Sequence, residues 1–170
     1  MDAATEKLWA ERAVRAINAA FPDVEHKMWP LCERLLTHAL LAAEWIEKYQ
    51  FIFPAASRLL NQTGVYLYER ARYGEAEPLY RRALRIREEQ LGGEHPETAR
   101  SLNNLAELYR VQGKYEEAEP LYRRALKIFK QKLGGEHPNT LVVQRNYARL
   151  LRAMGRDEEA VEVEGNRPPG

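Results

Sequence analysis

Four asparagines are the most distinctive polar residues of the sequence, because they recur at a spacing of 42 residues. Asn61 pairs with Asn103 in this way, and Asn104 pairs with Asn146. Asparagine is unfavourable inside a helix, where it costs roughly 0.5 kcal/mol relative to alanine, so its recurrence needs a physical reason. An amide is both donor and acceptor, and a row of amides can hold an extended peptide backbone of any sequence. The alternative is that these amides bond only to neighbouring helices or to water.

Arginines accompany the asparagines on the same predicted helices. A guanidinium group pairs with a carboxylate through two parallel hydrogen bonds, which favours an acidic segment or a C-terminal carboxylate as the ligand. A solvated charged face is the alternative. The arginines concerned are Arg58, Arg100, Arg110, Arg145, Arg149 and Arg152.

No pattern of residues indicates catalysis, a cofactor or a metal. The sequence has no Gly-x-x-x-x-Gly-Lys-Ser/Thr loop for phosphate, and its four histidines lack ligand-like spacing. His95 and His137 are repeat equivalents in successive linkers, so we expect them to be structural. Basic residues do not gather into a stripe with stacking aromatics. We therefore expect a protein that is not an enzyme, with no cofactor and no nucleic-acid partner.

One segment of the sequence occurs twice in nearly identical form, and its repetition predicts the architecture that positions these residues. Residues 78–98 read PLYRRALRIREEQLGGEHPET, and residues 120–140 read PLYRRALKIFKQKLGGEHPNT. A fixed period of this length indicates a solenoid, in which each unit buries its apolar face against its neighbours. Apolar spacing, prolines and glycines predict helices over 5–20, 29–49, 55–71, 75–90, 96–112, 117–132, 138–154 and 157–164.

The first 50 residues lie outside the clear repeats. Trp9, Ala13, Ala16, Ile17 and Ala20 form one apolar stripe of the first predicted helix. The second, more apolar, should pack on two sides and join the first helix to the array. We predict an N-terminal helical cap over 1–50, a repeat array over 51–164 and a disordered tail over 165–170.

Composition restricts the environment of the chain. The 170 residues carry a formal net charge of +1 with interleaved signs, and no apolar run is long enough to cross a membrane. The N-terminus has acids where a signal peptide needs basic residues. The single cysteine, Cys32, fits a reducing compartment and is expected to be buried. We predict a cytoplasmic protein with no membrane partner.

The repeated residues resemble those of tetratricopeptide repeats. The first copy has Ala71 where the turn glycine would be, and the third departs at Gln144, Leu151 and Asp157. The 42-residue unit with its Leu-Gly-Gly-Glu-His-Pro linker resembles the kinesin-light-chain-like subclass, and similar bacterial arrays are attached to signalling NTPases. The resemblance implies an all-α fold, a right-handed superhelical solenoid of antiparallel helix hairpins. The second copy carries it through Leu102, Leu105, Ala106, Tyr109, Gly113, Ala118, Tyr122 and Ala125.

The resemblance also implies a concave groove, lined by the first helix of each repeat, that holds peptides or protein segments. Some related arrays hold a peptide C-terminus with a Lys/Asn clamp, and this chain lacks the matching lysines. The second-helix arginines Arg81, Arg82, Arg123 and Arg124 should lie on the outer surface. The groove positions are Arg58, Asn61, Gln62 and Val65, then Arg100, Asn103, Asn104 and Glu107, then Val142, Arg145, Asn146 and Arg149.

These observations favour a non-enzymatic scaffold that binds a protein or peptide segment, acidic in character, in its groove. One alternative is a sensor or regulatory part of a larger signalling NTPase that acts in cis. Another is a homo-oligomer that stacks end to end, because the last second helix is short and leaves a repeat end without a cap. The near-identity of the two copies also suits an engineered repeat scaffold.

Overall fold

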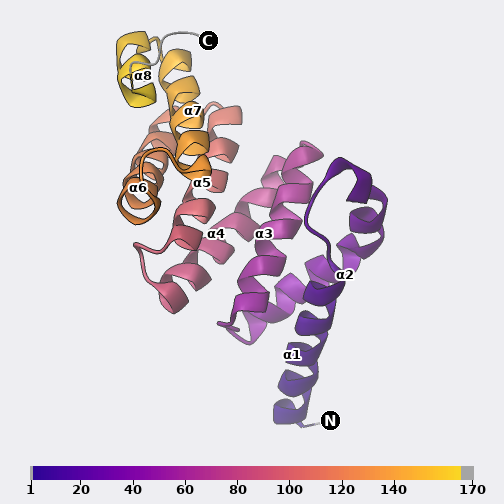
Figure 1. The fold of residues 1–170 in the computed structure, drawn as a ribbon. Helices are drawn as coiled ribbons and strands as arrows, with labels where there is room; N and C mark the ends of the chain where they lie inside the picture. The colour runs from indigo at the N-terminus through magenta and orange to yellow at the C-terminus, as the bar shows by residue number, and fades with distance from the viewer. Residues whose placement is uncertain (1, 166–170) are drawn as a thin grey trace. The chain divides into compact units, whose positions relative to one another are not determined.

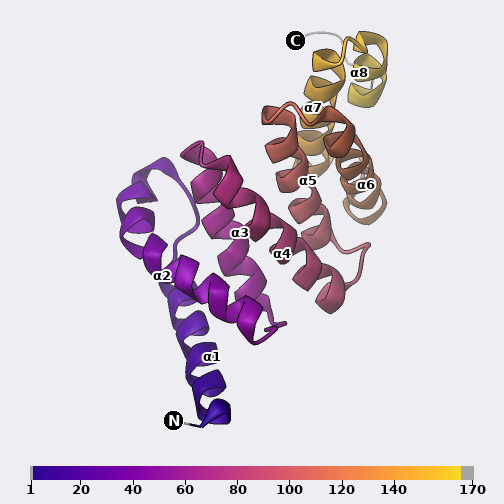
Figure 2. The ribbon, with the colours of Figure 1, turned by 180° about the vertical axis from the view of Figure 1, so that it is seen from behind.

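The computed structural model describes residues 2–165, and within that range the chain is all-helical (Figures 1 and 2). It divides into two compact units, Met1–Gly92 and Gly93–Gly170. The predicted boundary between cap and array at residue 50 falls inside the first unit and stays a prediction. Most of the predicted tail, residues 166–170, lies outside the described residues. No described helix is long and apolar enough to span a membrane.

The first unit contains α1 (Ala3–Ala20), the short 3-10 helix η1 (His26–Met28), α2 (Trp29–Lys48), α3 (Pro54–Glu69) and α4 (Tyr73–Leu91). The helix α2 packs against both α1 and α3, which gives it the joining position expected from its apolar sequence. Cys32 on α2 is fully buried, and burial raises the pKa of its thiol.

The predicted apolar stripe of α1 is wrong. Ala10 and Val14 are the buried residues of this helix, and Trp9 is 55% exposed. The helix has alanines on several sides, so two different apolar faces were available to pack. The face that begins at Ala10 packs on the core and leaves Trp9 in solvent.

The hairpin of α3 and α4 depends on one close approach. A Cβ atom at Gly64 would lie 2.7 Å from a ring carbon of Tyr80, so glycine lets the Tyr80 ring lie directly against the backbone of α3. The turn between the two helices contains Ala71 in the left-handed region, at φ 58°. The first hairpin therefore lacks the turn glycine that the later hairpins have at the equivalent position, although its backbone keeps the left-handed conformation that favours glycine.

The second unit contains α5 (Pro96–Val111), α6 (Tyr115–Leu133), α7 (Pro138–Ala153) and α8 (Asp157–Glu164). Fully buried alanines lie where the helices approach, at Ala106, Ala118, Ala125, Ala148 and Ala160. The turns inside its hairpins use Gly113 and Gly155 with φ of 76° and 75°.

The repeated linker starts each first helix in the same way. Pro96 and Pro138 occupy the first turns of α5 and α7, where a missing N–H costs nothing. The residue before each proline caps the helix: Nδ1 of His95 accepts from the backbone N–H of Glu97, and His137 does the same for Asn139. The expected structural role of these two histidines is a helix cap.

The tyrosines that recur at the repeat spacing, Tyr73 with Tyr115 and Tyr80 with Tyr122, are predicted to lie in the core. Tyr80 and Tyr122 are buried as expected, but Tyr73 and Tyr115 are only half-buried, because each begins a helix beside the turn. The helix bounds differ from the predicted ones by no more than two residues at each end.

Candidate protein-binding surface

The predicted groove residues all lie on first helices of hairpins, four in the first unit and eight in the second. On α5 the spacing of Arg100, Asn103, Asn104 and Glu107 places them on one face of the helix. On α7, Arg145 and Arg149 are one turn apart and share a face in the same way.

In the first unit the chain itself covers the predicted positions. Nη2 of Arg58 lies 2.8 Å from Oδ1 of Asp23, and Nε2 of Gln62 donates to the same oxygen over 2.7 Å. A second guanidinium nitrogen of Arg58 donates to the backbone oxygen of Asn18 over 3.0 Å. The connection from α1 to α2 therefore lies along the face of α3.

Burial fixes that connection in place. Phe21 is 1% exposed and has extended backbone at φ −75° and ψ 119°. Asn61 on α3 is also buried, and its side-chain nitrogen donates to the side-chain oxygen of Gln62 over 3.3 Å. Asn18 and Asp23 were not among the predicted residues, because nothing in the local sequence relates them to residues about 40 positions later.

In the second unit one amide pair bonds between helices. Nδ2 of Asn146 on α7 donates to Oδ1 of Asn103 on α5 over 3.2 Å. For this pair the structure agrees with the alternative interpretation of the asparagines, in which an amide bonds to a neighbouring helix. Each amide is half-buried and keeps one further polar atom.

Glu107 braces the hairpin of α5 and α6. Its carboxylate holds Arg110 at 2.6 Å and accepts from the hydroxyl of Tyr122 at 2.5 Å. Burial, and next the Glu107 charge, raise the pKa of Tyr122. The Tyr122 ring also stacks on Tyr147 at 6.0 Å between centroids, so these groups join three helices.

Three arginines give the second unit a positive face. Arg100 is exposed, with its guanidinium 3.3 Å from Glu97. Arg145 and Arg149 are exposed and make no ion pair with any residue between 2 and 165. A charge without an intramolecular partner keeps its full capacity to pair with an incoming carboxylate.

A small hollow lies beside these groups. It has a volume of about 60 Å³ and is lined by residues of α5, α6 and α7. A hollow of this size admits a small side chain or ordered water. Its lining residues are Arg100, Asn103, Phe129, Asn139, Val142 and Val143, of which Phe129, Asn139 and Val143 were not predicted from the sequence.

Two of the outer arginines are structural, which corrects the expectation that they lie free on the surface. Arg82 donates to the backbone oxygen of Ala43 at 2.8 Å and pairs with Glu47 at 2.6 Å. Its repeat equivalent Arg124 donates to the backbone oxygen of Gly93 at 2.9 Å. Their recurrence at the 42-residue spacing was the feature of the sequence that could have indicated this structural role. Within residues 2–165 no cluster of potential metal ligands occurs.

Helix hairpins of this length, repeated with small residues at their contacts and glycine in their turns, define a helical-repeat protein of the solenoid class. A family model described as tetratricopeptide repeat matches residues 55–131 and 101–164. The chain therefore belongs to the tetratricopeptide repeat family.

Solved structures share this fold. Two crystal structures of a Podosopora anserina kinesin light chain with nearly identical TPR-like repeats align with TM-scores of 0.69 and 0.68 at 22% identity. They cover 94% of this chain, which spans 69% and 70% of theirs. BtubC (BKLC) from P. vanneervenii aligns with a TM-score of 0.57 at 19% identity over 95% of this chain and 76% of its own. At these identities the likeness concerns the fold alone.

A curated relative is similar in sequence over a shorter region. A nucleotide-binding leucine-rich repeat (NLR)-like protein of Hyaloscypha variabilis is 34% identical over 86 residues, which is 51% of this chain. The matched region is 9% of that protein's length.

Proposed function

We propose that this chain is a protein-interaction module that holds an acidic segment of a partner on the first-helix face of its second unit. Tetratricopeptide folds are typically protein-binding and generally non-catalytic. The observation that carries the proposal is that Arg145 and Arg149 are exposed and have no carboxylate partner among residues 2–165.

The neighbouring groups suit an extended ligand. Arg100 on α5 lines the small hollow, together with Asn103, whose amide is bonded to Asn146 on α7. The arginines supply attraction for carboxylates, the amides supply donors and acceptors for a backbone, and the hollow takes one small side chain. Asn104 and Arg149 extend the proposed surface along the two helices. In the first unit, intramolecular hydrogen bonds already occupy the side chains of Arg58, Asn61 and Gln62. We therefore propose that they contribute less to partner binding.

The test is a binding titration with labelled acidic peptides, of which a sequence-scrambled and a neutral version are run in parallel. Arg145→Glu with Arg149→Glu should weaken acidic-peptide binding at least about tenfold, the equivalent of one lost charged hydrogen bond. The matched control is Lys127→Glu with Lys132→Glu, which makes the same charge change on exposed positions of α6. Equal affinities in both double variants would contradict the proposed surface.

The dependence of peptide binding on salt concentration distinguishes binding at this surface from non-specific electrostatic attraction. Binding that depends on paired carboxylates at Arg145 and Arg149 should weaken with ionic strength in the wild type, and much less in the double variant. A salt dependence that is the same in both proteins would place the binding elsewhere.

A second candidate is regulation in cis of a nucleotide-binding domain. The likeness to the NLR-like protein of Hyaloscypha variabilis favours it. The discriminating observation is whether the native reading frame continues upstream of Met1 into a nucleotide-binding domain. If it does, the Arg145→Glu/Arg149→Glu change should alter nucleotide hydrolysis by the longer protein; a rate that does not change would exclude this role for the same face.

A further inference from the structure

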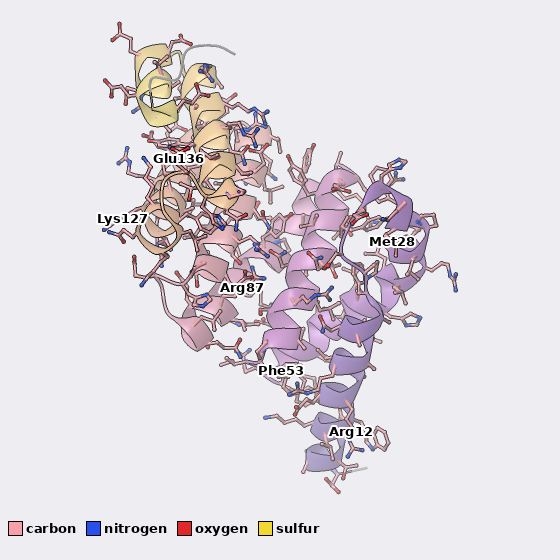
Figure 3. All side chains as sticks on the ribbon, viewed as in Figure 1. Arg12, Met28, Phe53, Arg87, Lys127 and Glu136 are labelled. Carbon is pink, nitrogen blue, oxygen red and sulfur yellow. The ribbon has the colours of Figure 1, made fainter. Side chains whose placement is uncertain are left out.

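A groove lies between α2 and α4, inside the first unit. It has a volume of about 670 Å³, and sites that hold ligands typically measure about 300–1,000 Å³. Its walls are formed within residues 40–48 of α2 and residues 74–82 of α4, and we call it the α2–α4 groove. The structure describes every residue of both walls. Figure 3 labels Met28, which precedes α2, and Arg87, which lies in the second half of α4 beyond the groove.

The floor of the α2–α4 groove is apolar. Ala43 and Leu79 are each 5% exposed, and Leu40, which lines the same groove, is half-buried. Arg82 on α4 donates to the backbone oxygen of Ala43 on α2 over 2.8 Å, so the two walls are joined by a hydrogen bond. An occupant should therefore present methylene or methyl groups to this floor, because they leave water on binding.

A proline alters the backbone of the α4 wall. Pro78 lies inside α4, four residues after Gly74, and both residues line the groove. Proline has no N–H, so the carbonyl of Gly74 lacks the donor that the fourth following residue supplies in a regular helix. Gly74 is exposed. The groove therefore offers a backbone acceptor to an N–H donor of a ligand.

The charged side chains of the groove form ion pairs, with one exception. Glu44 on α2 is exposed and has no ion pair with any residue between 2 and 165. Glu75 lies in the first turn of α4, where it also offsets the positive end of that helix. Glu44 is therefore the unbalanced charge of the groove. The ion pairs are Lys48 with Glu6 at 2.6 Å, Arg82 with Glu47 at 2.6 Å, Glu75 with Arg72 at 2.8 Å, and Arg85 with Glu47 at 3.6 Å and Glu89 at 4.0 Å.

An apolar floor beside two acceptors suits a cationic side chain with a long apolar stem. Lysine and arginine lay their methylene groups along apolar surface and keep the charged group at its edge. Such a stem would cover Leu40 and Leu79, and its charged group would donate to the Glu44 carboxylate and the Gly74 carbonyl. A carboxylate in the same place would be repelled by Glu44, and a purely apolar side chain would leave both acceptors without a donor from the ligand.

We infer that the α2–α4 groove binds a segment of a partner protein in which a lysine or arginine is flanked by apolar residues. The cation is attracted by Glu44, and the flanking residues bury the floor of the groove. The inference is independent of the proposed function, which concerns the second unit and an acidic segment. One partner that carries segments of both kinds could use both surfaces.

The test is an NMR titration of the full chain, labelled with nitrogen-15, against short peptides of alanine, leucine and glutamine in which one lysine is moved along the sequence. At least one peptide should bind with a Kd below about 1 mM, and the amide shifts should centre on residues 40–48 and 74–82. The same peptide with norleucine in place of lysine keeps an apolar stem without the charge, and a third version carries glutamate. Both should bind at least about tenfold more weakly than the lysine peptide.

Two variants of the groove and one matched control locate the binding. Glu44→Lys should weaken binding of the lysine peptide at least about tenfold, because it places a second cation where the first should bind. The control, Glu158→Lys, makes the same charge change on an exposed residue of α8 in the second unit and should bind as the wild type does. Pro78→Ala supplies the missing N–H to the Gly74 carbonyl, so it should weaken binding to a smaller extent while it raises the helix propensity of α4.

Three results would each overturn the inference. The first is that no lysine peptide binds at about 1 mM, or that the shifts lie outside the two walls. The second is equal affinity of the lysine and norleucine peptides, and the third is equal weakening by Glu44→Lys and Glu158→Lys. Thermal melts check that the variants fold; if Glu44→Lys does not, Glu44→Gln removes the charge with a smaller change. Glu44→Lys should leave the binding of acidic peptides unchanged, so this inference and the proposed function can fail separately.

Discussion

One backbone conformation is held by different residues at equivalent positions. Gly113 and Gly155 have φ near 75°, and Ala71 adopts the same left-handed region at φ 58°. An L-residue there costs roughly 1–2 kcal/mol, part of which is offset by the smaller entropy of the unfolded chain. The first hairpin therefore carries strain that the other two avoid.

We expect opposite changes in stability from reciprocal substitutions at these turns. Ala71→Gly should raise the free energy of unfolding by up to about 1 kcal/mol, and Gly113→Ala should lower it by about 1 kcal/mol or more. Urea unfolding followed by circular dichroism measures both. Gly74→Ala is the control, because its Cβ would meet no atom within 4 Å and α4 would gain helix propensity. Equal signs for Ala71→Gly and Gly113→Ala would show that the turn is not strained.

At the scale of elements, the helices were predictable because prolines and glycines mark their ends. The buried face of a helix was less predictable where the sequence is rich in alanine. Pro96, Pro138 and the turn glycines fix where helices begin and end, and these bounds were predicted within two residues. The alanine-rich α1 offered two apolar faces of similar width. Only the packing of α2 and α3 selects between them, so the exposed position of Trp9 was not predictable.

The same holds for the candidate site. The periodic sequence predicts which positions of α5 and α7 share a face, but not which side chains are already engaged. Asp23 reaches Arg58 and Gln62 from a non-repeating connection, and Glu107 is taken by Tyr122 and Arg110. Such contacts depend on rotamers and on distant segments, which have no local signature.

Glu119 anchors the last hairpin to α6. Its carboxylate lies 2.8 Å from Arg156 and 2.7 Å from Arg123, and accepts from the Tyr147 hydroxyl at 3.1 Å. The hydrogen bond from Arg156 is the largest cause that lowers the pKa of Glu119 below its ordinary value of 4.5. The ionised form is thus stabilised by folding.

The pH dependence of stability follows from that direction. Because the pKa is lower in the folded chain, the contribution of Glu119 is fully present above its ordinary value and is lost as pH falls through the lower folded value. Glu119→Gln should reduce the urea midpoint at about pH 7, with a smaller difference from wild type at about pH 3. Glu116→Gln, on the exposed first turn of α6, is the control. A difference that grows toward low pH would contradict this assignment.

At the scale of the whole molecule, the repeat distributes stability along the chain. Within each unit, the described helices pack mainly against the helices that precede and follow them in the chain. In arrays of this kind the total stability is close to a sum of repeat and nearest-neighbour contributions. A local defect should therefore be felt most in its own unit.

Paired core substitutions make that expectation measurable by hydrogen exchange. Gly64→Ala drives a methyl group against Tyr80 in the first unit and should cost about 1–3 kcal/mol, whereas Leu150→Ala leaves a cavity in the second and should cost about 2–5 kcal/mol. We expect Gly64→Ala to speed exchange in α3 and α4 and to leave α7 and α8 close to wild type, and Leu150→Ala to do the reverse. Uniform acceleration along residues 2–165 in both variants would instead mean that the two units unfold as one cooperative body, in which the repeats share their stability.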